Sequence, residues 1–344
     1  MCIRDSYQLS KRIAELTEAL MANYFVYDTE VLEGVWFRDG KFTYEQREEG
    51  TWLPFDTEHD TWGYADCYAW MKHSFTVPTR FAGRPVYYQI LPQEGKKWAW
   101  GSPQALLYAN GEALQGFDSN HTRTRLLDCA QGGEHYEMLL NLYAGGRDYE
   151  GKIGTRLRLL SVDDEVEKLY WHLRTPLEVA NLKEPDELAR IHLLQTLNEA
   201  VSLVSFHLPY GEDFLESVRE ATAYLEKKLY GKREMEATVS AVGHTHIDVA
   251  WLWRLRQTRD KTSRSFATVL KLMEEYPDYR FMSSQAQLYE FIRQEHPAIF
   301  ARIRESVRQG RWEPEGGMWV EADTNLSSGE SLVRQFLVGK RFFR

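Results

Sequence analysis

The chain has 344 residues, of which 43% are hydrophobic and 27% charged, and its formal net charge is -9. This composition predicts a globular protein with a sizeable core, and the negative charge argues against a nucleic-acid partner. No apolar run approaches 18 residues, so no membrane-spanning helix is expected. The sequence has three cysteines and no signal-peptide core near its start. We therefore expect a cytoplasmic protein without a disulfide framework.

The first unit, residues 1–29, is predicted to be an N-terminal helix. Leu9, Ile13, Leu16 and Leu20 recur at helical spacing within residues 7–24. We expect their apolar face to pack on the rest of the molecule and assign no chemistry to it.

Residues 30–175 are predicted to form an antiparallel β-sandwich of jelly-roll type. Short β-favouring runs alternate with turn residues, and Asn110-Gly111 is a strong hairpin signal. The runs lie at 35–40, 68–78, 86–92, 105–114, 135–145 and 155–162. Six tryptophans of this unit are expected to fill its core and interface, while sugar binding is the alternative. They are Trp36, Trp52, Trp62, Trp70, Trp98 and Trp100.

Residues 176–235 are predicted to be a helical connector. A first helix is expected to begin at Pro185-Asp186, with Leu188 and Leu194 in its apolar stripe. A second is expected from Glu212 to Tyr230 and is followed by Gly231, a residue type that often ends helices.

The last unit, residues 236–344, begins with ATVSAVGHTHIDVAWLW. Residues 237–242 are predicted to form a buried strand, and His244, His246 and Asp248 follow at every second position. Because alternate side chains of a strand share one face, two imidazoles and a carboxylate would project together. Such nitrogen and oxygen ligands suit zinc, and cobalt or manganese as alternatives. The spacing is compatible with a deacetylase, an amidohydrolase or a glycosidase.

The remainder of this unit alternates between helical and strand-like segments. Helices are expected at 261–276, 288–294 and 298–309 and from Ser327 or Ser328 to Phe343, and strands at 279–283 and 311–313. This alternation predicts a parallel sheet, whose functional sites lie at the carboxyl ends of its strands. His246, Asp248 and the loop 316–325 are all expected at such ends.

Three motifs carry a resemblance to a known family. They are GHTHIDVAW at 243–251, GGMWVEADTN at 316–325 and SGESLVRQ at 328–335. Together they resemble the N-terminal portion of glycoside hydrolase family 38 alpha-mannosidases, and most closely the cytosolic and bacterial branch. Segments 107–111 and 115–121 are similar to the jelly-roll segment that precedes the catalytic domain in that branch.

The resemblance implies a retaining hydrolase that cleaves terminal alpha-linked mannose from oligosaccharides. It implies a barrel-like α/β catalytic domain with one zinc, and places metal ligands at His246 and Asp248. His244 would then support the ligands from a second shell, and Trp251 would line the sugar subsite. Asp323 is expected to bind a sugar hydroxyl or to cap a helix.

The family's nucleophile lies in a Pro-Asp-x-Phe-Gly-like motif, which these 344 residues do not contain. The resemblance places both the nucleophile and the acid/base beyond Arg344, so we expect a truncated catalytic domain that is inactive alone. Glu321 and Asp323 are the nearest carboxylates, and a catalytic role for them is the less favoured interpretation.

Two other functions compete with a family 38 glycosidase. Another HxHxD metal hydrolase would need further ligands, and the remaining downstream histidine, His296, opens a predicted helix. A non-catalytic carbohydrate-binding protein would use the sandwich and keep glycan affinity without residues 237–344. The sequence leaves open whether the protein forms a homo-oligomer.

Overall fold

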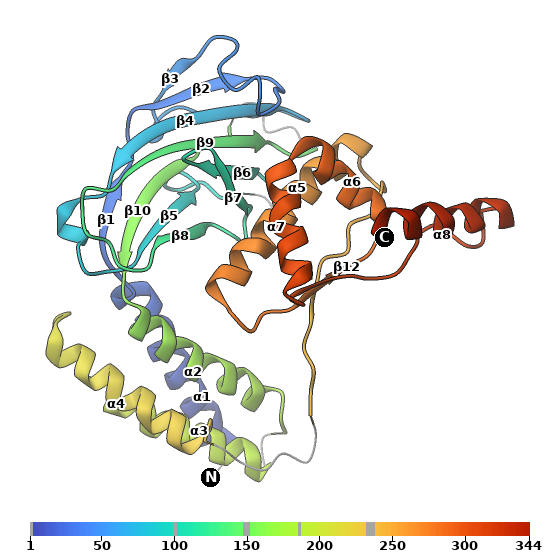
Figure 1. Cartoon of the computed structure of the whole chain (residues 1–344). Coiled ribbons are helices and arrows are strands. Elements are labelled where there is room, and N and C mark those ends of the chain that lie inside the picture. Colours follow the sequence, from blue (N-terminus) through green and yellow to red (C-terminus); the bar gives the residue numbers. More distant parts are fainter. Residues whose placement is uncertain (1–2, 99–101, 147–151, 185–186, 232–237) are drawn as a thin grey trace.

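The computed structural model describes residues 3–98, 102–146, 152–184, 187–231 and 238–344. Three units are visible in Figure 1: a β-sandwich, a group of helices beneath it, and a C-terminal α/β unit at its side. The helix α8 projects away from the other elements. No helix within the described residues is both long and apolar enough to cross a membrane.

The sandwich consists of two antiparallel sheets, as predicted. The six-stranded sheet has the order β3-β2-β4-β9-β6-β7 and the four-stranded sheet the order β1-β10-β5-β8. The strands of the first sheet are β2 (Val35–Asp39), β3 (Leu53–Phe55), β4 (Tyr68–Thr76), β6 (Gln104–Ala109), β7 (Glu112–Phe117) and β9 (His135–Tyr143). Those of the second are β1 (Val26–Val31), β5 (Val86–Leu91), β8 (Arg123–Leu127) and β10 (Arg156–Val162).

Alternating side chains of the strands form the core between the sheets. In β4, Ala69 and Met71 are fully buried on the inner face. The hairpin predicted at Asn110-Gly111 is confirmed, and both residues have the positive φ that a tight turn requires, 49° and 87°.

Trp62 and Trp70 are buried as expected, whereas Trp36 is 44% exposed because it lies on the outer face of β2. Trp100 lies outside the described residues.

The helical unit is formed by segments that precede and follow the sandwich in the sequence. It contains α1 (Ile3–Ala19), which continues as a π-helix at Leu20–Tyr24, together with α2 (Asp164–Asn181), α3 (Leu188–Leu203) and α4 (Glu212–Lys228). Their apolar faces meet in one core, in which Ile13, Leu20, Leu169 and Leu197 are fully buried. The helices predicted at 7–24, after Pro185-Asp186 and at 212–230 are therefore present, although Pro185-Asp186 itself lies outside the described residues and α3 is described from Leu188.

The helix α2 was not predicted and begins inside the range 30–175 assigned to the sandwich. The sandwich ends at Val162, and Asp163 caps the helix by accepting a hydrogen bond from the Glu165 backbone N–H at 3.0 Å. Acidic residues fill the first turn, where they complement the helix dipole. The boundary between the sandwich and the helices therefore lies at residue 163.

The C-terminal unit contains a three-stranded parallel sheet with the order β11-β12-β13. Its strands are β11 (Gly243–His244), β12 (Phe281–Ser283) and β13 (Trp312–Pro314). Its helices are α5 (Leu255–Glu275), α6 (Ala286–Glu295), α7 (Pro297–Arg308) and α8 (Gly329–Phe343). The predicted order of strands and helices is confirmed, and Ser328 caps α8 as expected.

One strand was predicted wrongly. Residues 238–242 are not in a strand, and Ala237 lies outside the described residues. Val239 is 82% exposed, and pairing with β12 begins only at Gly243. Within the described residues, no strand pairs with 238–242. The predicted ligands His246 and Asp248 therefore follow a strand of only two residues, β11.

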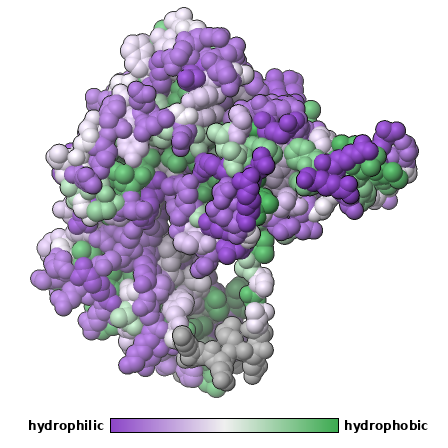
Figure 2. Space-filling view, in the orientation of Figure 1, coloured by the Kyte–Doolittle hydropathy of each residue, from purple (hydrophilic) through white to green (hydrophobic). Residues whose placement is uncertain are grey.

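Aromatic residues form the core of the C-terminal unit. Trp312 packs edge-on against Phe266 and Phe281, with ring centroids 5.0 and 4.6 Å apart. In contrast, Val333, Phe336 and Leu337 of α8 are exposed, and Figure 2 shows hydrophobic surface along this helix.

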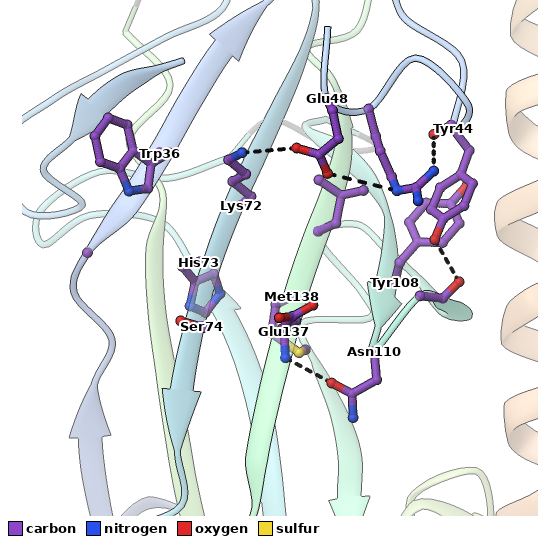
Figure 3. A pocket seen from close by; sticks show the side chains of 14 residues that line it. Trp36, Tyr44, Glu48, Lys72, His73, Ser74, Tyr108, Asn110, Glu137 and Met138 are labelled. Atoms are coloured by element: carbon purple, nitrogen blue, oxygen red, sulfur yellow. Dashed lines mark hydrogen bonds and ion pairs between the residues drawn. The ribbon is translucent and has the colours of Figure 1, made fainter.

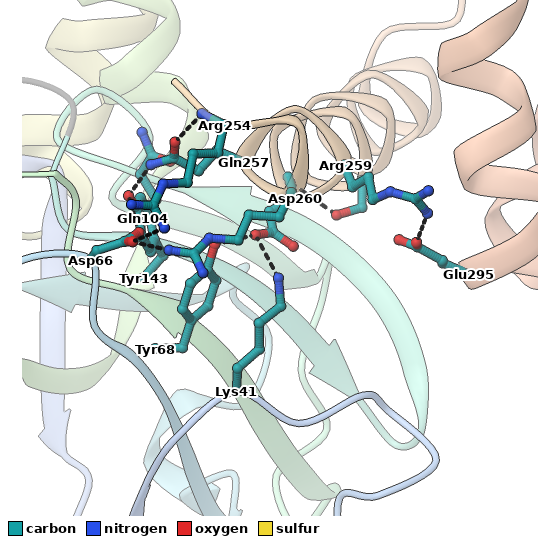
Figure 4. Close-up of polar contacts among 12 residues, drawn as sticks. Lys41, Asp66, Tyr68, Gln104, Tyr143, Arg254, Gln257, Arg259, Asp260 and Glu295 are labelled. Carbon is teal, nitrogen blue, oxygen red and sulfur yellow. Dashed lines mark hydrogen bonds and ion pairs between the residues drawn. The ribbon is translucent and has the colours of Figure 1, made fainter. Parts of the chain in front are cut away.

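The helix α5 connects this unit to the sandwich (Figure 4). The Tyr68 hydroxyl donates to Asp260 at 2.6 Å, and Arg256 forms an ion pair with Asp66. At Gly116 of β7 an added Cβ would lie 2.9 Å from the Arg264 carbonyl oxygen, so only glycine permits this close approach. The sandwich thereby supports the helix that follows the HxHxD segment.

Candidate metal and sugar site

Three loops meet at one edge of the parallel sheet. They follow His244 at the end of β11, Ser283 at the end of β12 and Pro314 at the end of β13. Because the strands are parallel, their carboxyl ends lie at the same edge, as predicted for the HxHxD segment and the loop 316–325.

His246 is the centre of the side-chain contacts at this edge. Its Nε2 lies 3.1 Å from Asp248 Oδ1, and its Nδ1 lies 3.3 Å from Glu321 Oε2. Glu321 also accepts a hydrogen bond from the Ser284 hydroxyl. The imidazole is thus held between two carboxylates, one from its own loop and one from the loop after β13.

Gln285 joins these loops through its side chain. Its Nε2 donates to the Ile247 carbonyl at 2.9 Å, and its Oε1 accepts from the Glu321 backbone N–H at 3.2 Å. The residue is 4% exposed and has a φ of 67°, which is uncommon for a non-glycine residue. Sequence reasoning missed Gln285 because it belongs to none of the three motifs.

The other predicted site residues have different surroundings. His244 contacts the Met282 carbonyl of β12 through Nδ1 at 3.0 Å, so it helps to hold β11 in the sheet. Trp251 is 67% exposed, and its ring packs edge-on against Trp253 at 5.7 Å. Asp323 Oδ1 accepts from the Asn325 and Leu326 backbone N–H groups, at 2.8 and 3.3 Å. Asp323 therefore caps a turn and not a helix, since the cap of the following helix α8 is Ser328.

The donor atoms of His246 and Asp248 suit a shared divalent ion. Two ligands that bind one zinc ion at about 2.0–2.2 Å lie about 3 Å from each other, and these two atoms are 3.1 Å apart. Within the described ranges, no group of three or more His, Cys, Asp or Glu side chains is arranged to hold a metal ion. The residues therefore fit part of a coordination shell.

Replacing Gln285 with Ala is expected to loosen the loops without removing any predicted ligand. The buried Ile247 carbonyl would lose its partner at a cost of about 1–3 kcal/mol, and the part-buried Glu321 N–H would lose its partner at a smaller cost. We expect a lower free energy of unfolding and faster amide exchange at 245–250 and 318–323. Hydrogen exchange of the variant and of Gln294→Ala, a control at the far end of α6 whose side chain contacts Glu290, would measure this. Equal protection in both variants would contradict it.

In a comparison with known protein families, residues 236–344 match the glycosyl hydrolases family 38 N-terminal domain. The chain is 30% identical over 295 residues to alpha-mannosidase G of Dictyostelium discoideum, covering 80% of this chain and 26% of that protein. It is 31% identical over 298 residues to human alpha-mannosidase 2C1, covering 83% of this chain and 28% of that protein.

A yeast alpha-mannosidase from Saccharomyces cerevisiae is 36% identical over 168 residues, which are 48% of this chain and 14% of that protein. A Ruminococcus gnavus beta-glucuronidase structure has a TM-score of 0.27 and 9% identity, covering 41% of this chain and 30% of that chain, too low to support an argument. The chain spans about a quarter of the length of the first two relatives.

The parallel α/β unit with an HxHxD segment at its sheet edge is that of a glycoside hydrolase domain. More specifically, residues 236–344 are a glycosyl hydrolases family 38 N-terminal domain. The resemblance stated from the three motifs is confirmed.

Proposed function

We propose that the protein is a retaining, metal-dependent alpha-mannosidase that acts on terminal alpha-linked mannose in oligosaccharides. The observation that supports this proposal is the convergence of His246 Nε2 and Asp248 Oδ1 at the carboxyl edge of the parallel sheet. Family membership and the names of the relatives supply the reaction and the sugar.

In this proposal His246 and Asp248 hold one divalent ion, zinc in the first instance and cobalt as an alternative. The ion would supply positive charge that grips mannose hydroxyls next to the bond that is cleaved. In this structure His246 Nε2 is hydrogen-bonded to Asp248 Oδ1, and Glu321 Oε2 lies 3.3 Å from Nδ1. With the ion bound, Glu321 would take the Nδ1 proton as its hydrogen-bond partner, which would leave the Nε2 lone pair for the ion and fix the ring plane. Ser284 donates to the other oxygen of Glu321 and so orients that carboxylate.

Trp251 is proposed to form one wall of the sugar subsite. It follows Asp248 by three residues, and its large exposed ring offers a flat apolar surface to a pyranose. Asp323 is the second proposed sugar contact, through the carboxylate oxygen that its turn does not use.

Neither catalytic carboxylate is assigned to these 344 residues. A retaining glycosidase needs two carboxyl groups about 5 Å apart. Glu321 is bound to His246 and Ser284, and Asp323 caps its own turn. The sequence contains no Pro-Asp-x-Phe-Gly-like segment. We propose that this polypeptide contributes metal and sugar contacts and that other residues contribute the nucleophile and the acid.

The test is hydrolysis of an aryl alpha-mannoside. We expect the protein as the cell makes it to release mannose with retained configuration, as followed by proton NMR, and to lose activity on chelation. We expect the 344-residue polypeptide alone to show no turnover. Inversion, or cleavage of only a beta-mannoside, would contradict the proposed reaction, and turnover by the 344 residues would contradict the placement of the carboxylates.

Another HxHxD metal hydrolase is the second candidate function. It would need additional histidine or aspartate ligands, and His296 is instead the residue between α6 and α7. The family match favours the glycosidase. The cytoplasmic location and homo-oligomer formation stay predictions.

A further inference from the structure

A pocket with a volume of about 490 Å³ lies on the outer face of the six-stranded sheet. Side chains of β2, β4 and β9 form its floor, and the loop 40–50 forms one wall (Figure 3). It shares no lining residue with the HxHxD edge. Its volume falls in the range of about 300–1,000 Å³ that is usual for small-molecule sites.

Aromatic rings stand on two sides of this pocket. Trp36 on β2 is 44% exposed, and its cross-strand neighbour is Lys72 of β4. Tyr44 stacks on Tyr108 with ring centroids 4.6 Å apart, and its hydroxyl donates to the Gly111 carbonyl at 2.9 Å. Figure 3 shows Trp36 and Tyr44 on opposite sides, with the polar groups between them.

The polar groups are balanced in charge and held in place by contacts with one another. Lys72 Nζ lies 3.4 Å from Glu48 Oε2, and Arg47 Nε lies 4.0 Å from Glu48 Oε1. Asn110 Oδ1 accepts from the Glu137 backbone N–H at 2.9 Å. Two cations and two carboxylates therefore line the pocket.

This lining selects the chemistry of a ligand. A charged ligand would be attracted by the two pocket side chains of opposite charge and repelled by the two of the same charge. A neutral ligand with hydroxyls that both donate and accept would satisfy both pairs. A pyranose has such hydroxyls, together with an apolar C–H face that fits an exposed indole.

We propose that this pocket is a second carbohydrate-binding site, separate from the HxHxD edge, that takes a neutral hexopyranose unit of a glycan. Trp36 covers the apolar face of the sugar ring, while Lys72, Glu48 and Glu137 bind its hydroxyls. The site needs no metal, because none of these contacts involves one. The sandwich then holds a branch or neighbouring residue of a glycan and raises its local concentration.

The test measures binding of methyl alpha-mannopyranoside and an alpha-linked mannobiose to residues 1–344 in buffer with EDTA, by calorimetry and ligand-observed NMR. EDTA separates this site from the proposed metal site. We expect millimolar affinity or better, and Trp36→Ala to weaken it about tenfold, which corresponds to about 1.4 kcal/mol. Trp171→Ala is the matched control, because Trp171 is 49% exposed on the helix α2.

Glu48→Gln is a second variant on an exposed loop, chosen because it leaves the strands intact, and it should also weaken binding. His246→Ala should leave the affinity in EDTA unchanged. The proposal is overturned if neither sugar binds in EDTA at millimolar concentrations. It is also overturned if Trp36→Ala binds as well as Trp171→Ala, or if His246→Ala abolishes binding. None of these results would decide whether the protein is a mannosidase, which the hydrolysis assay tests.

Discussion

Replacing Asp248 with Asn is expected to weaken Zn²⁺ binding by about 100-fold or more, since losing a direct ligand exceeds the 10–100-fold cost of losing an outer contact. Asn keeps the shape of the side chain but removes its negative charge, and its amide oxygen is a weaker ligand. His246→Ala removes the other ligand and should have an effect at least as large. Equilibrium dialysis of Zn²⁺ and the absorption spectrum of bound Co²⁺ would measure both variants.

Two further variants make this result specific. Glu321→Gln should weaken metal binding by about tenfold, because Glu321 only orients His246 through Nδ1. Asp323→Asn, on the same loop, should leave it unchanged, because Asp323 caps a turn. Equal affinity in Asp248→Asn and the unchanged protein would remove His246 and Asp248 from the metal site. Equal losses in all four variants would indicate a general disturbance of the loops.

Replacing Trp312 with Ala is expected to lower the free energy of unfolding of the C-terminal unit by about 3–5 kcal/mol. Trp312 is 1% exposed and packs against Phe266, Phe281 and Tyr289. Its removal leaves a large cavity and also takes the Nε1 donor, 2.9 Å away, from the Tyr289 hydroxyl.

Urea unfolding followed by near-ultraviolet circular dichroism would measure this loss. Trp171→Ala, in the helical unit, is the control and should change stability little because half of its surface is already in water. A change of less than about 1 kcal/mol for Trp312→Ala would show that the aromatic cluster does not hold the unit together.

The order of strands and helices in the C-terminal unit follows from local patterns, and so does the edge at which His246 and Asp248 lie. Periodicity reports which residues share a face, but it does not report whether a partner strand is present. Residues 237–242 have the pattern of a buried strand, yet Val239 is exposed where no strand pairs with it. Glu321 contacts His246, 75 positions earlier in the sequence, and Ser284, 37 positions earlier. No local sequence pattern encodes contacts over such separations.

The helix α2 is a different case, because its signal was present in the sequence. Asp163 and the acidic residues after it form a recognisable helix start. The strand β10 ends at Val162 and runs directly into this helix, and Pro176 lies inside it. The helix was not recognised because no loop separates it from the strand before it and because it contains a proline.

The helical unit is discontinuous along the chain, and this affects how the protein can be divided for expression. Its core joins α1, at residues 3–19, to helices that begin only after residue 163. Removing residues 3–24 would expose the apolar faces of the other helices, against which the fully buried Ile13 and Leu20 pack. Cutting before residue 164 to isolate the sandwich would leave α1 without its partners. The sandwich and its helices are therefore best produced together, as one piece that spans both segments.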